Sequence, residues 1–335
     1  MFNVAVVGAT GAVGGVMLRV LEERGFPVTR LIPLASARSA GHEIDYLGKP
    51  FTVQELTENS FEDVQIALFS AGGSRSREFA PAAVEAGAVV IDNSSAYRMD
   101  DAVPLVVPEV NESAIEAHSG IIANPNCVAA PLVVALKPLV DAVGLQRVVL
   151  SSYQSVSGTG AAAIEELTAQ TAGNLAGDEP PAQVYPHPIA FNALPHIDDF
   201  EDNGYTGEEV KVMNETRKIL GLPDLAVSAT CVRIPVYRSH SISVQIETAD
   251  KISADDARRL LMAAPGVVLT DDPGNNHYPL AREAEGRDEV FVGRIREDSS
   301  HPRGLALWVV SDNLRKGAAT NAVQVAESLV TRGWL

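Results

Sequence analysis

The sequence predicts an α/β protein in which a doubly wound parallel sheet is joined to a second, α+β domain. In the first third of the chain, short apolar runs alternate with helical patterns, which is typical of a parallel sheet covered by helices. From residue 147 on, longer stretches alternate between apolar and polar residues, which favours a mixed or antiparallel sheet with one covered face. The length of 335 residues suits two domains.

The individual elements follow from these two patterns. Apolar runs predict short buried strands in the first part, at residues 4–7, 31–35, 64–69, 88–91, 105–107 and 121–123. Helical periodicity predicts helices among and after them, at residues 13–24, 76–86 and 128–140. The second part predicts strands at residues 147–156, 226–236, 239–248, 290–296 and 305–310. It also predicts helices at residues 161–171, 207–220, 254–263 and 314–330.

A long connection rich in proline and acidic residues spans residues 172–206. Connections of this length inside compact domains are usually functional, interfacial or disordered. Because residues 186–192 are too apolar for a solvated linker, we expect a packed loop that contributes to a subunit contact.

The net charge of −17 and the pI of about 4.8 make nucleic acids and anionic membranes poor partners. An anionic ligand would therefore need a local cluster of Arg, Lys and main-chain N–H groups.

Two cysteines are too few for a disulfide scaffold. No apolar run reaches the roughly 18 residues of a transmembrane helix, and residues 1–3 show no leader pattern. We therefore expect a cytoplasmic protein.

Three glycines, Gly8, Gly11 and Gly14, follow the first predicted strand and open the first predicted helix. Their spacing is a variant of the dinucleotide fingerprint, in which glycines allow the main chain to approach a pyrophosphate. The helix N-terminus adds free N–H groups and a partial positive charge. This pattern predicts a Rossmann-type domain that binds a dinucleotide.

The end of the second predicted strand indicates which dinucleotide is bound. An acidic residue at this position usually binds the ribose 2′-hydroxyl of NAD. Residues 35–39 contain no carboxylate but supply Ser36, Arg38 and Ser39. Hydroxyl and guanidinium groups suit a 2′-phosphate, so we expect NADP in preference to NAD.

Cys127 lies between a predicted strand and a predicted helix, where the helix dipole would stabilise a thiolate. This position predicts a nucleophile, whereas Cys231 lies within an alternating strand and is expected to be a buried structural residue. Among the seven histidines, His240 stands out because it joins two predicted strands beside two arginines. The histidines and cysteines show no metal-ligand spacing, so no metal is expected.

These residues lie within segments that resemble the aspartate-β-semialdehyde dehydrogenase family over essentially the whole chain. Each segment alone is weakly specific, but together they are highly specific. The matching segments are residues 6–14, 92–100, 106–111, 124–127, 155–158, 190–198, 214–220, 233–240 and 312–319.

The resemblance implies an NADPH-dependent conversion of 4-phospho-L-aspartate to L-aspartate-4-semialdehyde through a cysteine acyl-thioester. In cells this reaction would feed lysine, diaminopimelate, threonine and methionine biosynthesis. It also implies a homodimer whose second domain resembles that of glyceraldehyde-3-phosphate dehydrogenase. The NADP-binding domain would comprise residues 1–126 and be completed by a C-terminal helix at 313–335, while residues 127–312 would form the catalytic and dimerisation domain.

The resemblance also implies roles for individual residues. Cys127 would be the nucleophile, His240 the acid/base catalyst and Gln154 the amide that orients the substrate. Arg233 would bind the substrate carboxylate, Glu208 would face its ammonium group, and Asn126 would contribute to substrate binding. Arg98 and Lys211 would bind phosphate. The expected cofactor contacts are Gly8, Thr10, Gly11, Ala12, Val13, Ser36, Arg38, Ser39, Ser157, Gly158 and Asn313.

One feature departs from the family pattern. The family usually has small hydroxyl residues after the nucleophile, whereas this chain continues Val128-Ala129-Ala130, which points to a change in the reaction rate.

Two alternative functions stay open from the residues themselves. One is N-acetyl-γ-glutamyl-phosphate reductase, and the other is an NADP-binding paralogue without catalysis. A Cys/His hydrolase would not account for the glycine loop or Arg38.

Overall fold

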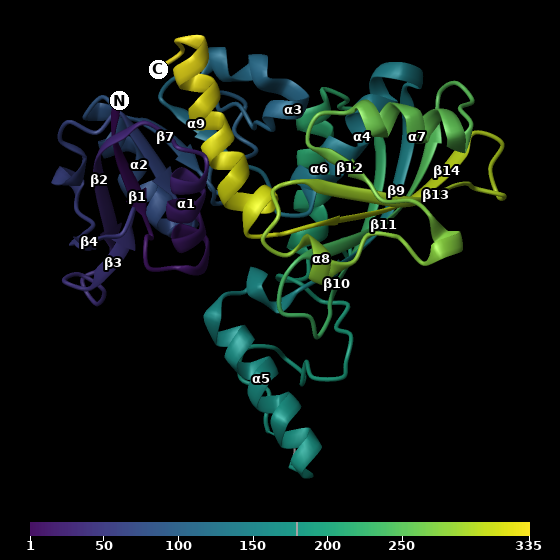
Figure 1. Ribbon diagram of the computed structural model, residues 1–335, viewed down its shortest axis with the longest axis horizontal. Helices are drawn as coiled ribbons and strands as arrows, with labels where there is room; N and C mark the ends of the chain where they lie inside the picture. Colours follow the sequence, from purple (N-terminus) through teal and green to yellow (C-terminus); the bar gives the residue numbers. More distant parts are fainter. Residues whose placement is uncertain (179) are drawn as a thin grey trace. The chain divides into compact units, whose positions relative to one another are not determined.

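The computed structural model describes residues 1–178 and 180–335. The chain divides into two compact units (Figure 1). The first unit comprises residues 1–126 and 317–335, and the second comprises residues 127–316.

The first unit is built on a six-stranded sheet in which every pair of neighbours is parallel. The strand order is β5-β2-β1-β6-β7-β8, so the chain starts in the middle of the sheet and extends it in both directions. The apolar runs of the sequence form these strands because both faces of the sheet are covered. The strands are β1 (Phe2–Val7), β2 (Val28–Ala35), β5 (Gln54–Glu55), β6 (Ile66–Phe69), β7 (Val89–Asp92) and β8 (Ile121–Ala123).

Helices pack against this sheet within the first unit. Helix α2 (Gly73–Glu85) contributes Phe79, Ala80 and Ala83 to a buried cluster that includes alternate residues of β1, β2 and β6. Helix α1 (Ala12–Glu23) contacts β1 and also α9 (Thr320–Arg332), the last helix of the chain. The unit is completed by α3 (Pro108–Asn111) and by the hairpin of β3 (Glu43–Tyr46) and β4 (Lys49–Thr52). The prediction of a doubly wound parallel sheet is confirmed.

The second unit contains a six-stranded mixed sheet with the order β10-β9-β11-β14-β13-β12. Its central pairs are antiparallel, and the outer pairs β10–β9 and β13–β12 are parallel. This confirms the prediction of a mixed sheet in the α+β domain. The strands are β9 (Leu145–Gln154), β10 (Ala226–Arg233), β11 (His240–Thr248), β12 (Val267–Leu269), β13 (Val290–Glu297) and β14 (Gly304–Ser311).

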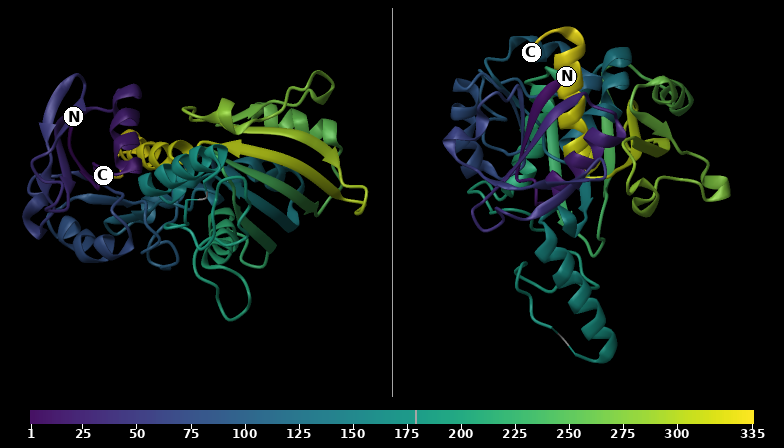
Figure 2. Two further views of the ribbon diagram at one scale, coloured as in Figure 1. Left: turned by 90° about the horizontal axis from the view of Figure 1, so that it is seen from below. Right: turned by 60° about the vertical axis from the view of Figure 1, so that its left-hand side comes forward.

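Helices α4 (Ala129–Val143), α6 (Gly207–Leu220) and α7 (Ala254–Ala263) contact the strands and one another. The left view of Figure 2 shows helices along one face of the long strands. Burial alternates along β9, β10 and β11, as expected for a sheet with one covered face. The one-turn helix α8 (Ala281–Ala284) contacts β14.

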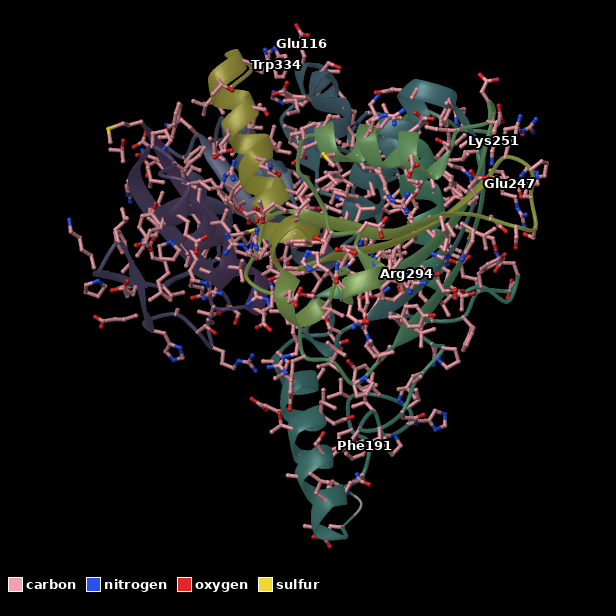
Figure 3. The ribbon with its side chains drawn as sticks, turned by 45° about the vertical axis from the view of Figure 1, so that its right-hand side comes forward. Glu116, Phe191, Glu247, Lys251, Arg294 and Trp334 are labelled. Atoms are coloured by element: carbon pink, nitrogen blue, oxygen red, sulfur yellow. The ribbon has the colours of Figure 1, made fainter. Side chains whose placement is uncertain are left out.

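Helix α5 (Ala161–Ala176) extends away from the sheet of the second unit (Figures 1 and 2). The connection that follows packs back on it, because the Glu166 carboxylate accepts the main-chain N–H groups of Gln183 and Val184. Ile189 is fully buried in this arm, whereas Phe191 is 68% exposed (Figure 3). The expected packed loop is therefore present among the described residues of 172–206.

Several predicted boundaries are wrong. Residues 105–107 form only an isolated bridge at Leu105, because Pro104 and Pro108 on either side carry no N–H for a strand ladder. Strand β10 ends at Arg233, before Pro235, and not at residue 236. The final helix begins as a π-helix at Arg315–Ala319 and becomes α-helical only at Thr320. The strands β3, β4, β5 and β12 were not predicted.

Candidate active site

The predicted nucleophile and the predicted acid/base catalyst lie together in the second unit. The Cys127 sulfur is 3.3 Å from Nε2 of His240. Cys127 occupies the turn before α4, and His240 is the first residue of β11. The two residues are 113 positions apart in the sequence. Val128, at the helix N-cap, provides no side-chain cap, in keeping with the missing hydroxyl groups noted in the sequence.

The His240 ring is almost completely buried, with an exposed fraction of 1%. The main-chain N–H of Ser155 donates to Nδ1 at 3.0 Å, and the Ser155 hydroxyl is 3.1 Å from the same atom. Burial lowers the pKa of His240 to about 3, and the nearby Arg233 guanidinium contributes to this shift. The imidazole is therefore neutral at physiological pH.

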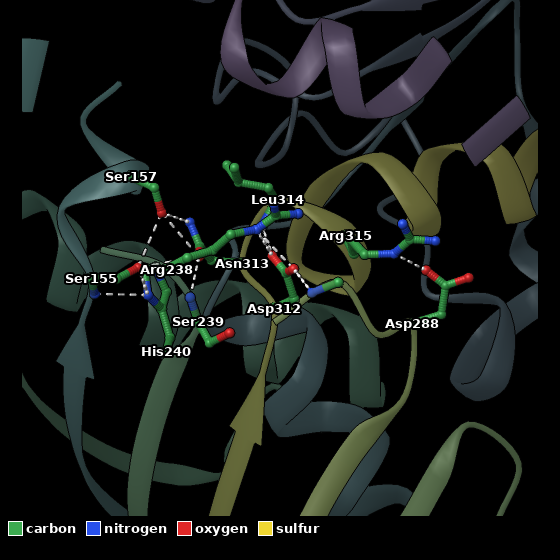
Figure 4. Close-up of polar contacts among 11 residues, drawn as sticks. Ser155, Ser157, Arg238, Ser239, His240, Asp288, Asp312, Asn313, Leu314 and Arg315 are labelled. Carbon is green, nitrogen blue, oxygen red and sulfur yellow. Dashed lines mark hydrogen bonds and ion pairs between the residues drawn. The ribbon is translucent and has the colours of Figure 1, made fainter. Parts of the chain in front are cut away.

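The turn between β10 and β11 aims His240 at this position. Ser239 has a φ of 70°, a left-handed conformation that is unfavourable for a residue with a side chain. Its N–H donates to Oδ1 of Asn313 at 2.9 Å, and the Asn313 amide donates to Ser157 at 3.0 Å (Figure 4). Beside it, Arg238 forms an ion pair with the fully buried Asp312. These contacts hold the strained turn.

Arg233 lies at the end of β10 and is 6% exposed. Its Nη1 donates to the main-chain carbonyl of Ser155 at 2.7 Å, while its buried Nε has no hydrogen-bond partner among the described residues. A Cβ on Gly158 would lie 3.3 Å from Arg233 Nη1 and 3.6 Å from His240 Nε2. Glycine at this position therefore leaves space beside both side chains.

Gln154 and Glu208 form a second buried pair in the same unit. Gln154 ends β9 and pairs with Arg233 across the β9–β10 ladder. Its amide donates to the Glu208 carboxylate and to the Ser152 hydroxyl, both at 3.1 Å. Glu208 lies in the first turn of α6, which begins with a capping box formed by Thr206 and Glu209. The amide and the carboxylate are thus held in fixed positions.

Lys211 lies one helical turn after Glu208, at 3.9 Å from its carboxylate. Its ammonium also forms an ion pair with Asp198, whose pKa is lowered by this lysine against the opposing effect of burial. Asp198 belongs to a segment that carried the family resemblance, but no motif in the chain assigned it a role. It is the residue that fixes Lys211.

The glycine loop of the first unit has the geometry of a dinucleotide cradle. Gly8 has a φ of 85°, and a Cβ on Gly14 would lie 2.1 Å from the Gly8 carbonyl oxygen. Only glycine allows α1 to start so close to the end of β1. Thr10 and Gly11 follow Gly8, and α1 begins at Ala12, one residue before the predicted start at Val13.

A cavity of about 460 Å³ lies beside this loop within the first unit. Ser36, Arg38 and Ser39 line it together with Gly8 and other loop residues. Glu55 and Arg75 also line it. Neither was singled out from the sequence, because the end of β5, which holds Glu55, and the first turn of α2, which holds Arg75, meet here only in the folded unit. The cavity combines a glycine cradle with hydroxyl and guanidinium groups, a donor set that fits a phosphorylated dinucleotide.

Arg98 and Asn126 also lie in the first unit and are largely buried. The Arg98 guanidinium donates to the main-chain carbonyls of Asn93 and Asn124. Asn126 directly precedes the nucleophile in the chain. These hydrogen bonds position the Arg98 side chain, and the expected roles of Arg98 in phosphate binding and of Asn126 in substrate binding stay predictions.

The comparisons with known proteins cover both units. The chain matches the NAD binding domain of semialdehyde dehydrogenases over residues 3–118 and their dimerisation domain over residues 136–316. It is 58% identical to the aspartate-semialdehyde dehydrogenase of Aquifex aeolicus over 99% of both chains. The chain belongs to the aspartate-semialdehyde dehydrogenase family. This confirms the resemblance found in the sequence.

Solved structures of other family members have the same fold. The crystal structure of aspartate semialdehyde dehydrogenase II from Vibrio cholerae, complexed with ASA, is 50% identical with a TM-score of 0.96, covering 99% of this chain and 98% of that one. The Candida albicans enzyme, determined with NADP, is 25% identical with a TM-score of 0.78 over the whole of both chains. As a family member, the chain is an oxidoreductase of amino-acid biosynthesis that uses a nicotinamide cofactor.

The second cysteine of this aspartate-semialdehyde dehydrogenase family member has the expected structural character. Cys231 is fully buried in β10, and burial raises the pKa of its thiol.

Within residues 1–178 and 180–335, no cluster of His, Cys, Asp and Glu could hold a metal ion. No helix of this same part of the chain has both the length and the apolar character needed to cross a bilayer.

Proposed function

We propose that the chain reduces 4-phospho-L-aspartate to L-aspartate-4-semialdehyde with NADPH, with Cys127 as the covalent nucleophile. The observation that carries the proposal is the 3.3 Å approach of the Cys127 sulfur to His240 Nε2, in the turn that opens α4. A sulfur at a helix N-terminus favours the thiolate, and an adjacent imidazole can serve the oxygen of the attacked carbonyl. Residues 127–316 would form the catalytic unit.

In the first step the Cys127 thiolate attacks the acyl carbon, and the bond from this carbon to the phosphate oxygen breaks. Phosphate leaves, and an acyl-thioester forms on Cys127. The nicotinamide would supply the hydride that reduces this thioester. The carbon–sulfur bond then breaks, releasing the aldehyde and regenerating the thiolate. His240 Nε2, next to the sulfur, is positioned to stabilise the oxygen on which negative charge develops.

Substrate recognition would use the buried polar groups around this pair. Arg233 offers a guanidinium with an unpartnered Nε, which suits the α-carboxylate of the substrate. Glu208, held by Gln154, would face the substrate ammonium. This carboxylate favours an aspartyl substrate over N-acetyl-γ-glutamyl phosphate, which carries no free ammonium. Lys211, positioned by Asp198, and Arg98 would each bind phosphate.

The first unit would bind NADP in preference to NAD. Ser36, Arg38 and Ser39 line the cavity at the end of β2, and no carboxylate ends that strand. Arg75 supplies a second guanidinium to the same cavity. The Candida albicans relative was determined with NADP, which agrees with this preference. Ser157, Gly158 and Asn313 are proposed as further cofactor contacts.

A homodimer is the expected assembly. The match of residues 136–316 to the family's dimerisation domain supports it, as does the protruding arm of α5 with the exposed side chains Leu175 and Phe191. Sedimentation of the purified protein would measure the mass of the particle directly.

An assay of NADP reduction with aspartate semialdehyde tests the proposal. Turnover is expected only when inorganic phosphate is present, and NADP is expected to be used more efficiently than NAD. Equal rates with and without phosphate would overturn the acyl-thioester mechanism. Turnover of N-acetylglutamate semialdehyde at a higher rate would overturn the proposed substrate.

A further inference from the structure

The His240 ring is held on its Nδ1 side by a group that can only donate a hydrogen bond. The main-chain N–H of Ser155 points at Nδ1 from 3.0 Å. An amide N–H cannot accept, so Nδ1 must be the acceptor and carries no proton. A neutral imidazole has a single N–H, which must then be on Nε2. Nε2 is the atom 3.3 Å from the Cys127 sulfur.

We propose that Ser155 is a positioning residue whose main-chain amide fixes His240 as the Nε2–H tautomer. His240 then faces the sulfur and the reacting carbonyl oxygen as a hydrogen-bond donor, and not as a base that accepts the thiol proton. The role at the carbonyl oxygen rests on the proposed function, whereas the tautomer does not depend on the substrate.

The groups around the ring also oppose a second proton. A protonated Nδ1 would lose the hydrogen bond from the Ser155 N–H and would place two N–H groups against each other. The Ser155 hydroxyl, 3.1 Å from Nδ1, and the Ser239 main chain, which raises the pKa of His240, act in the opposite sense but do not outweigh burial and Arg233. The Arg233 guanidinium approaches from the end of β10, Cys127 lies before α4, and the Ser155 hydroxyl lies after β9. Because the ring is 1% exposed, water cannot screen the repulsion between an imidazolium and Arg233. The lowered pKa of His240 agrees with this arrangement.

A network of hydroxyl and amide groups holds Ser155 in place. The Ser155 hydroxyl lies 3.2 Å from both the Asn313 Oδ1 and the Ser157 hydroxyl. The Ser239 N–H fixes the orientation of the Asn313 amide, because Oδ1 must accept this bond (Figure 4). Ser157 and Asn313, which were predicted as cofactor contacts, are 3% and 2% exposed. Their side chains therefore also connect Ser155 to the residue that precedes His240.

The chemistry balances without any net proton transfer to His240. The Cys127 thiol loses its proton to solvent before the reaction, and the thiolate is regenerated when the carbon–sulfur bond breaks. The oxygen that becomes negatively charged on reduction accepts a hydrogen bond from Nε2–H and returns to a carbonyl when the aldehyde forms. The proton consumed in the reductive direction comes from solvent or buffer and is taken up by the phosphate as it leaves. His240 keeps its Nε2 proton throughout.

Nitrogen NMR of the full-length protein, labelled with ¹⁵N in its histidine rings, tests the tautomer directly. The His240→Asn variant assigns the resonances. At neutral pH we expect a pyrrole-type Nε2 and a pyridine-type Nδ1, unchanged down to about pH 5. A pyridine-type Nε2, or a doubly protonated ring at neutral pH, would overturn the proposal.

Replacing one amide by an ester tests the role of Ser155. Ser155→Ala removes only the side-chain hydroxyl. Ser155→lactic acid, introduced by nonsense suppression, has the same methyl side chain but replaces the main-chain N–H by an ester oxygen. The matched control is Thr159→Ala against Thr159→lactic acid, since the Thr159 N–H bonds the Val156 carbonyl in the same turn. The ester at 155 is expected to populate the Nδ1–H tautomer and to lower kcat about tenfold or more, with KM little changed. The ester at 159 should leave the tautomer unchanged.

An unchanged tautomer in the ester at 155 would refute the role of Ser155, whatever the activity. Conversely, a protein that shows the expected tautomer shift but no phosphate-dependent turnover of aspartate semialdehyde would refute only the proposed function. The two proposals therefore fail on different measurements.

Discussion

The Gln154 amide donates a hydrogen bond to the Glu208 carboxylate at 3.1 Å, and both side chains are buried. The pair joins the end of β9 to the first turn of α6. A buried carboxylate is costly unless a cation faces it, and the Lys211 ammonium lies 3.9 Å away, one helical turn further along α6.

Glu208→Gln should raise the KM for aspartate semialdehyde about tenfold or more, because a buried charge pair with the substrate ammonium is lost. Steady-state kinetics with succinate semialdehyde, which has no ammonium, provide the contrast. The KM of the variant for succinate semialdehyde should equal that of the wild type. The exposed Glu201→Gln is the matched control. An equal loss on both substrates would show that Glu208 does not face the ammonium.

Cys127→Ala should lower turnover at least about a thousandfold, because no thioester can form. Binding of NADPH, measured by fluorescence titration, should stay unchanged. Cys231→Ala is the control, since this buried thiol lies within β10 and takes no part in the proposed reaction. Turnover by Cys127→Ala close to that of the wild type would exclude Cys127 as the nucleophile.

Arg38→Ala should weaken NADPH binding about tenfold or more and leave NADH binding nearly unchanged, because only NADPH carries the 2′-phosphate. Titration calorimetry with each cofactor measures the difference. Arg30→Ala, an exposed arginine on the same strand, is the control. Adding Arg75→Ala should enlarge the loss of NADPH affinity, since both guanidiniums line the cavity. Equal losses for the two cofactors would contradict the assignment.

The lowered pKa of His240 predicts a pH-dependent stability. The pKa of His240 is about 3 in the folded chain, against about 6.5 for an unperturbed histidine. Between these values the unfolded chain binds a proton that the folded chain does not, so stability is full above about pH 6.5 and is lost as the pH falls toward 3.

Thermal unfolding at neutral pH and at about pH 5 measures this loss. His240→Gln should show a smaller decrease in Tm between the two conditions than the wild type. His277→Gln, which replaces an exposed histidine, should show the same decrease in Tm as the wild type. A decrease in His240→Gln as large as that of the wild type would mean that His240 is not buried as a neutral ring.

The arm of the second unit shows how far local sequence patterns reach. The apolar character of residues 186–192 predicted a packed loop, and Ile189 is indeed buried. The sequence could not indicate that Gln170 on α5 accepts the main-chain N–H of Ile189, or that Glu166 accepts the N–H groups of Gln183 and Val184 just before this loop. These contacts join positions on either side of the helix end, and no periodicity encodes them.

The sequence by itself determined the alternation of strands and helices, the glycine cradle and the pair of Cys127 and His240 as candidates. These are local properties, because apolar periodicity and glycine spacing depend on neighbours along the chain. Only the tertiary structure decided that Ser155 fixes the His240 ring, that Asp198 holds Lys211 and that Arg75 joins Arg38. The first contact depends on the strained turn at Ser239, which places His240 beside the end of β9. The other two each bring a loop and a helix together, so neighbours along the chain do not encode them.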